Sequence, residues 1–136
     1  MDRTSMKKLI SQCLAALLLV TSGFVLAQQN KSEMIAVAAS NKTVSASVSS
    51  QAGLSPFFLL FDKQGTFVEA VDNPYAKDAG RAGIPTVDFL AGKGVKVLVA
   101  GSFGPNIIEV MKDKGMRPVE FKGNAKDAVK KAMEPK

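Results

Sequence analysis

The stretch that most constrains the fold of this chain is residues 95–107, where an apolar run meets a glycine-rich turn and a helix-like pattern. Residues 95–100, Val-Lys-Val-Leu-Val-Ala, have the composition of a buried strand. Pro105 suits the first position of a helix, because the N–H at that position has no partner inside the helix and proline lacks it. We therefore predict a strand, a turn and a helix that begins at Pro105.

The same turn has the features of an anion-binding site. The backbone N–H groups of Gly104, Asn106 and Ile107 would lie at the positive end of the helix dipole, where anions bind. An ordinary strand-to-helix connection, in which Gly101 and Gly104 only make the turn, fits these residues as well. Other segments of the chain have to separate the two interpretations.

The first 27 residues have the layout of a secretory signal. Basic residues precede an apolar run over residues 14–26, and polar residues follow Ala27. An uncleaved membrane anchor is the alternative, but the strongly apolar part is only about half the ~20 residues that a membrane-spanning helix needs. We therefore predict cleavage after Ala27, export to the periplasm and no stable membrane span.

Cleavage would leave a short lead-in, residues 28–33, and one domain over residues 34–134. The 136-residue chain is 46% hydrophobic and 22% charged, which is typical of a globular protein with one core. Without the signal, 15 basic and 11 acidic residues remain, a net charge of +4. This charge suits an anionic ligand and a solvated basic surface equally well, and export argues against nucleic-acid binding. We expect a monomer.

The cysteine and histidine content restricts the chemistry of the mature domain. The one cysteine, Cys13, lies in the predicted signal, and the chain has no histidine. The usual protein ligands for zinc, copper or an iron–sulfur cluster are therefore missing, and so are the common nucleophile–base pairs of enzymes. The remaining soft donors are methionines, which we interpret as packing residues: Met34, Met111 and Met116. We predict a protein that is not an enzyme.

The order of apolar runs and turn residues predicts an α/β fold. Three strands come first, and helices then alternate with two further strands. The expected strands are residues 34–39, 56–62, 66–72, 95–100 and 117–121, and the expected helices begin near Ile84, at Pro105 and after the cap Asn124.

This order predicts a mixed five-stranded sheet flanked by helices. If residues 34–39 pair in parallel with residues 95–100, both strands end at one edge of the sheet, where ligands of such folds collect. Three loops would meet there: residues 40–53, residues 77–83 and residues 101–106.

Four segments together resemble the dinitrogenase iron–molybdenum cofactor-binding family. They are Met34-Ile-Ala-Val-Ala-Ala39, the loop Val48-Ser-Ser-Gln-Ala-Gly-Leu-Ser55 with the strand after it, the Asp72-Asn-Pro turn, and Val99-Ala-Gly-Ser-Phe-Gly-Pro-Asn106. The family includes carriers of nitrogenase cofactor assembly and the orange protein, which holds a molybdenum–copper–sulfide cluster. The resemblance implies a ribonuclease-H-like fold and a non-covalently held, anionic molybdenum or iron–sulfur-type cluster.

The resemblance also implies where the ligand lies, namely at the edge formed by the three loops. The candidate binding residues are Gln51, Gly53, Arg81, Gly101, Gly104, Asn106 and Ile107. A related oxyanion is a second ligand of the same class, and a protein that receives the cluster is the implied partner. The family commonly has Ser-Pro-His-Phe-Gly-Arg-Ala in the first loop, whereas this chain has Gln51 in the place of the histidine and Leu54 near the arginine.

Two other functions have to be compared with the carrier. A nuclease of the ribonuclease H type needs clustered carboxylates for two metal ions, one of them on the first strand, and residues 34–39 contain none. A regulatory or interaction module that kept the fold and lost the ligand is the stronger alternative, because Gln51 replaces the family's histidine. The carrier remains the preferred hypothesis.

Overall fold

The computed structural model describes residues 33–78 and 82–135 of the chain. The predicted signal over residues 1–27, Cys13 within it, nearly all of the lead-in and the candidate residue Arg81 lie outside the described residues. Their predicted roles stay predictions.

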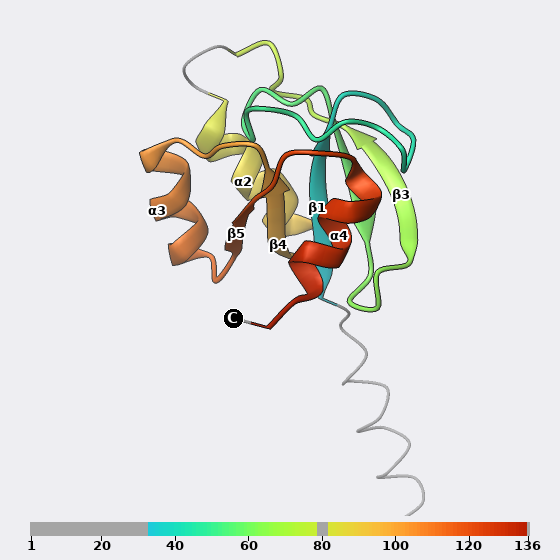
Figure 1. Ribbon diagram of the computed structural model, residues 1–136. Coiled ribbons are helices and arrows are strands. Elements are labelled where there is room, and N and C mark those ends of the chain that lie inside the picture. Colours follow the sequence, from blue (N-terminus) through green and yellow to red (C-terminus); the bar gives the residue numbers. More distant parts are fainter. Residues whose placement is uncertain (1–32, 79–81, 136) are drawn as a thin grey trace, which may run out of the picture. The chain divides into compact units, whose positions relative to one another are not determined.

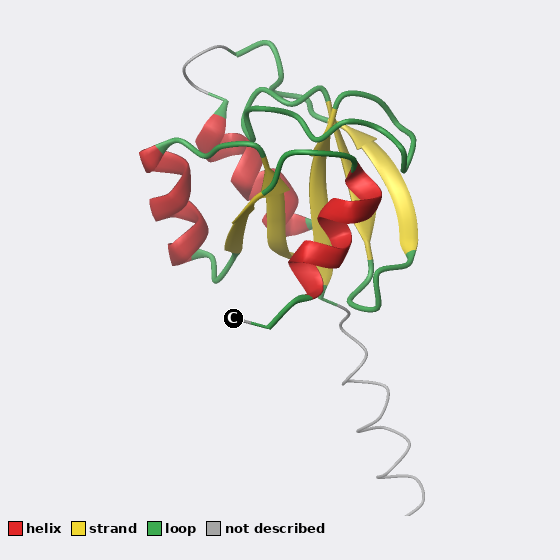
Figure 2. Ribbon diagram, viewed as in Figure 1, coloured by secondary structure: helices red, strands yellow, loops and turns green. Residues whose placement is uncertain are grey.

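Five strands of the described part form one mixed sheet (Figures 1 and 2). They are β1 (Met34–Ala39), β2 (Phe57–Phe61), β3 (Phe67–Asp72), β4 (Val95–Ala100) and β5 (Arg117–Glu120). The sheet order is β3-β2-β1-β4-β5. β1 pairs antiparallel with β2 and parallel with β4, so the α/β fold and the central pairing predicted from the sequence are confirmed.

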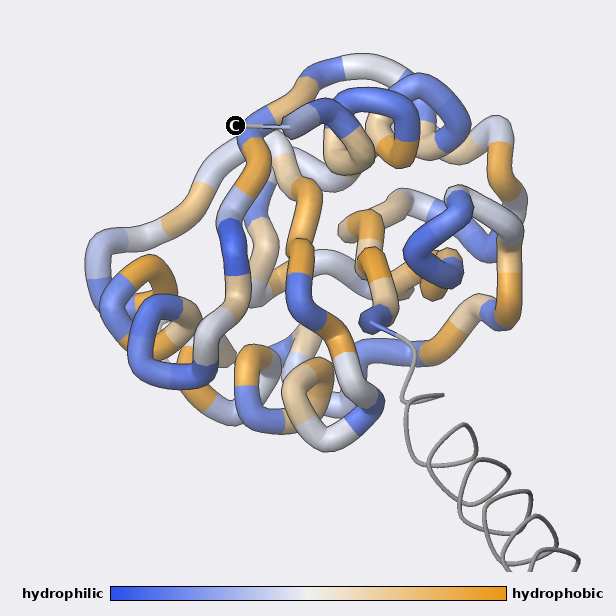
Figure 3. Tube along the Cα trace, turned by 90° about the horizontal axis from the view of Figure 1, so that it is seen from below, coloured by the Kyte–Doolittle hydropathy of each residue, from blue (hydrophilic) through white to orange (hydrophobic). Residues whose placement is uncertain are grey.

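The helices cover both faces of the sheet: α2 (Gly83–Gly92), α3 (Pro105–Asp113) and α4 (Ala125–Met133). Because side chains alternate along a strand, β1 contributes Ile35 and Val37 to the core under α4 and Ala36 and Ala38 to the core under α2 and α3. Figure 3 shows hydrophobic strand segments in the middle of the molecule, with hydrophilic segments mostly around them.

The central strands supply most of the core. In β2, Phe58 and Leu60 lie on one face and Leu59 lies on the other, and all three are at most 1% exposed. Each such side chain contributes about 1.5–3 kcal/mol through burial. The short strand β5, with Pro118, is at the edge of the sheet, as proline requires.

α2 begins close to its predicted start, and a glycine follows the end of α3. α2 begins at Gly83 with Pro85 in its first turn, and α3 ends at Asp113, two residues before Gly115, whose φ is +69°. α3 packs against the core through Ile107 and Met111, and Ile108 is 39% exposed.

The loop between β1 and β2 is extended near Val48. Val48 forms a bridge with Ala39, and Ser47 forms one with Asn124 at the start of α4. The loop therefore returns across the edge where β1 ends. Among residues 33–78 and 82–135, no helix has the length and hydrophobicity needed to cross a membrane.

Candidate functional site

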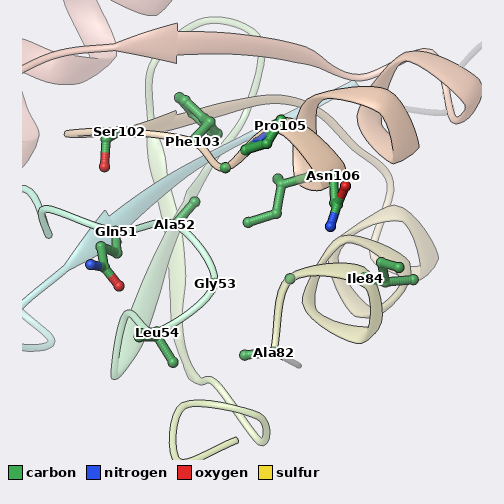
Figure 4. Close-up of a pocket in the computed structure, with 13 residues that line it drawn as sticks. Gln51, Ala52, Gly53, Leu54, Ala82, Ile84, Ser102, Phe103, Pro105 and Asn106 are labelled. Atoms are coloured by element: carbon green, nitrogen blue, oxygen red, sulfur yellow. The ribbon is translucent and has the colours of Figure 1, made fainter. Parts of the chain in front are cut away.

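A cavity of about 430 Å³ opens where three loops meet at one edge of the sheet (Figure 4). Its walls are the loop after β1, the start of α2, and the turn between β4 and α3. This volume is in the usual range for a small-ligand pocket. The lining residues are Gln51, Ala52, Gly53, Leu54, Ala82, Gly83, Ile84, Ser102, Phe103, Gly104, Pro105, Asn106 and Ile107.

Most of the candidate residues named from the sequence come together in this cavity. Gln51, Gly53, Gly104, Asn106 and Ile107 all line it. In Figure 4 the Gln51 loop lies across the cavity from Asn106, and the Ser102–Pro105 turn closes the upper side.

Gly101, another candidate, is not among the lining residues. Its N–H donates a hydrogen bond to the Ser49 carbonyl at 2.8 Å. A Cβ at Gly101 would lie 2.9 Å from the Ser50 Cα, closer than real Cβ contacts come. The close approach of the Ser49–Ser50 backbone therefore accounts for glycine at this position.

The first turn of α3 carries backbone N–H groups at the border of the cavity. Gly104 occupies the N-cap position without a side-chain cap, and Pro105 follows as the first helical residue. In the described part of the chain, no backbone carbonyl or side chain accepts from the N–H groups of Asn106 and Ile107, whereas the Ile108 N–H donates to the Gly104 carbonyl. These two N–H groups lie at the positive end of the helix dipole.

Gly104 differs from the other glycines of the site. A Cβ at Gly104 would meet no other described heavy atom within 4 Å, and its φ of −72° is open to any residue. A Cβ at Gly83 would lie 2.5 Å from Cγ1 of Ile107, so packing requires glycine at Gly83. Packing does not require glycine at Gly104, where a side chain would only take up open space beside the cavity.

The wall that carries Gln51 is bonded to the β4–α3 turn. The Ser102 hydroxyl donates to the Ser50 carbonyl at 2.6 Å, and the Ala52 N–H donates to the Ser102 carbonyl at 3.3 Å. Ser102 was not among the residues predicted from the sequence. It joins two walls of the cavity that lie about fifty positions apart in the chain.

A second set of polar contacts lies behind the loop, and sequence reasoning missed it as well. The side chains of Asn73 and Thr86 are nearly fully buried, and the Asn73 amide donates to the carbonyls of Gly53 and Ser55 at 3.0 and 2.9 Å. The Asp72-Asn-Pro turn was noted in the sequence only as a strand end and a family motif. A polar side chain just after a strand, followed by proline, was the available signal.

The chemistry of the lining suits a bound anion better than a bare metal ion. None of the described lining residues is charged, and the polar side chains are those of Gln51, Ser102 and Asn106. Within the described residues, no group of three or more His, Cys, Asp or Glu side chains could hold a metal. Met111 and Met116 are buried in the core under α2 and α3, as expected for packing residues. The cavity can hydrogen-bond a ligand but offers no set of metal ligands.

Solved structures share this fold. The apo form of the orange protein from Desulfovibrio gigas superimposes with a TM-score of 0.66 at 25% sequence identity, covering 72% of this chain and 84% of that one. A Thermotoga protein described as a NifB protein of the DUF35 family superimposes with a TM-score of 0.62 at 29% identity, with the same coverage of 72% and 84%. No curated protein sequence matches the chain.

The resemblance seen in the four sequence segments is confirmed over the whole described domain. The sequence profile described as "Dinitrogenase iron-molybdenum cofactor" matches residues 33–134. The chain therefore belongs to the dinitrogenase iron–molybdenum cofactor family.

Proposed function

We propose that this protein is a non-catalytic carrier that holds a preassembled, anionic metal–sulfur cluster in the cavity at the end of β1 and β4. The observation that carries the proposal is the open first turn of α3, whose Asn106 and Ile107 N–H groups have no partner in the described chain and border a cavity of about 430 Å³. Family membership supports a metal-containing ligand.

The donor set decides how such a ligand would be held. A bare metal ion needs several ligating side chains, and the described lining residues supply no such set. A cluster that already carries its own sulfide ligands needs only hydrogen-bond donors and a favourable dipole. Backbone N–H groups with the Asn106 and Gln51 amides supply these donors. We therefore propose binding without a protein–metal bond.

Two parts of the proposal rest on the sequence alone. Arg81, expected to pair with the anionic charge, lies outside the described residues, and so does the signal that would export the protein to the periplasm. Transfer of the cluster to a receiving protein is likewise part of the proposal.

A titration of the purified protein with tetrathiomolybdate, followed by absorbance, tests the proposal. We expect saturable binding to the wild-type protein and at least about tenfold weaker binding to Gly104→Val, because the new side chain occupies the open space beside the α3 donors, and tenfold corresponds to about 1.4 kcal/mol. Gly92→Val is the matched control: a Cβ there also meets nothing within 4 Å, and Gly92 lies at the far end of α2.

Molybdate and phosphate, titrated in parallel, test the ligand class. We expect both to bind more weakly than tetrathiomolybdate, because a small, strongly hydrated anion costs more to desolvate and the described lining residues carry no charge to offset that cost. If the wild-type protein binds none of the three anions and gains no metal during expression with molybdate and sulfide, the interaction module on the same fold replaces the carrier.

A further inference from the structure

The described chain buries three uncharged polar side chains. Ser55 belongs to the loop that forms one wall of the cavity, and Asn73 and Thr86 contact that loop. Ser55, Asn73 and Thr86 are 0%, 6% and 1% exposed. Asn73 donates to the carbonyls of Gly53 and Ser55, and the Thr86 hydroxyl lies 3.4 Å from both the Gly53 carbonyl and the Asn73 Oδ1. The Ser55 hydroxyl lies 2.8 Å from the Phe57 carbonyl and does not contact Gly53. Two of the three therefore converge on one carbonyl.

These contacts set the direction of the Gly53–Leu54 peptide. The Gly53 carbonyl points towards Asn73 and Thr86, into the protein. In a trans peptide the N–H lies on the side opposite the C=O, and the described backbone contains no cis peptide. The Leu54 N–H therefore points away from the buried pair. Among residues 33–78 and 82–135, no backbone carbonyl accepts from it, and Gly53 and Leu54 both line the cavity.

Because residue 53 is glycine, its backbone could adopt either orientation of the Gly53–Leu54 peptide. Rotation of the Gly53–Leu54 peptide changes the ψ angle of Gly53, and glycine tolerates values that other residues avoid. With the peptide reversed, a carbonyl oxygen would face the cavity and repel an anion, and one N–H of the buried Asn73 amide would lose its acceptor. The other Asn73 N–H would keep the Ser55 carbonyl, and the Thr86 hydroxyl would keep Asn73 Oδ1. Leaving a buried donor unpaired costs about 1–3 kcal/mol. The buried pair thus favours the orientation that presents an N–H group.

We propose that Asn73, supported by Thr86, is a positioning residue for the cavity: it holds the Gly53 carbonyl inside the protein so that the Leu54 N–H joins the α3 donors facing the ligand. This inference rests on the proposed anion-binding function. It adds a backbone donor on the loop after β1, across the cavity from the α3 donors.

Four variants, titrated with tetrathiomolybdate, test the role of the pair. Asn73→Ala should weaken binding by about tenfold or more, and Thr86→Val by about threefold, since valine keeps the shape of threonine but cannot donate. Thr86→Ser should restore wild-type affinity. Ser55→Ala is the control, because it removes an equally buried hydroxyl that does not contact Gly53, so it should lower stability and leave affinity unchanged.

The Leu54 amide provides a readout that a merely structural role would not move. In ¹⁵N-labelled wild-type protein its NMR signal should shift on titration with tetrathiomolybdate, and in Thr86→Val this shift should shrink while the shifts of Asn106 and Ile107 persist. If Asn73→Ala does not fold, the Thr86→Val and Thr86→Ser pair decides alone.

The outcomes separate this inference from the proposed function. A wild-type protein that binds no tetrathiomolybdate overturns the carrier function and the positioning role with it. Wild-type binding with unchanged affinity in Asn73→Ala and Thr86→Val overturns only the positioning role. A loss of affinity in Ser55→Ala as large as in Thr86→Val overturns it too, since general destabilisation would then explain the effect.

Discussion

The starts of α3 and α4 differ in whether their first backbone N–H groups have hydrogen-bond partners in the described chain. At α4, the Ala125 and Lys126 N–H groups donate to the carbonyls of Ala46 and Val44, and the Asn124 side chain accepts from the Asp127 N–H at 2.8 Å. At α3, Gly104 offers no side chain, and packing of Ile107 on Gly83 fixes the first turn instead. The chain closes one helix start with its own groups and leaves the other open beside the cavity.

This difference explains how an open helix start is maintained. Each unpaired N–H group would otherwise be satisfied by a cap, which typically contributes about 1 kcal/mol. At α3 the contact between Ile107 and Gly83 holds the turn without covering its donors. Ile107 and Gly83 therefore stabilise the first turn of α3 by packing, whereas a capping side chain would stabilise it by accepting from the N–H groups that border the cavity.

The largest change in the free energy of unfolding is expected at the contact between Gly83 and Ile107. A Cβ at Gly83 would lie 2.5 Å from Cγ1 and 2.9 Å from Cδ1 of Ile107, so Gly83→Ala should lower the free energy of unfolding by about 1–3 kcal/mol. In an Ile107→Ala background the nearest remaining atom is the Cβ, at 3.9 Å, and the same substitution should cost nothing further. Urea denaturation of the two single variants and the double variant measures this coupling. Additive effects would show that the two residues do not hold the turn together.

A smaller effect is expected at the α4 cap. Asn124→Ala removes the acceptor for the Asp127 N–H and should lower the free energy of unfolding by about 1 kcal/mol. Affinity for tetrathiomolybdate should stay within twofold of wild type, because Asn124 is not part of the cavity lining. Urea denaturation and the absorbance titration measure the two quantities on one protein sample. A tenfold loss of affinity would mean that the helix starts are not independent.

The smallest change in stability is expected when α3 is given the cap of α4. Gly104→Asn should raise the free energy of unfolding by a few tenths of a kcal/mol, because asparagine caps a helix slightly better than glycine. The same substitution should weaken anion binding by about tenfold, since its side chain would accept from the Ile107 N–H. A variant that gains stability and keeps its affinity would contradict a binding role for the α3 donors.

The sequence predicted the local features of both helix starts, because their signals are local. Pro105 at the first helical position and Asn124 as a cap are written into neighbouring residues, and both are confirmed. The meeting of the loop after β1 and the β4–α3 turn followed from the strand order, which the apolar runs of β1 and β4 made clear. Local signals and strand order were enough to locate the cavity.

The missed features depend on contacts between distant segments. Asn73 and Thr86 reach the Gly53 carbonyl from 20 and 33 positions away. The polar residue before a proline marks Asn73 as a turn residue, but nothing in the sequence indicates which carbonyl either side chain contacts. Gly101 and Gly104 look equivalent in the turn, but the Ser50 backbone packs against only the first of them. Such distinctions arise from packing, which spacing and composition do not encode.

An NMR titration of the ¹⁵N-labelled wild-type protein with tetrathiomolybdate tests the central claim most directly, because it observes both helix starts at once. We expect saturable shifts of the Gly104, Asn106 and Ile107 amides and none at residues 125–127, whose N–H groups already have partners. Equal shifts at both helix starts, or no saturable shift at α3, would contradict the central claim.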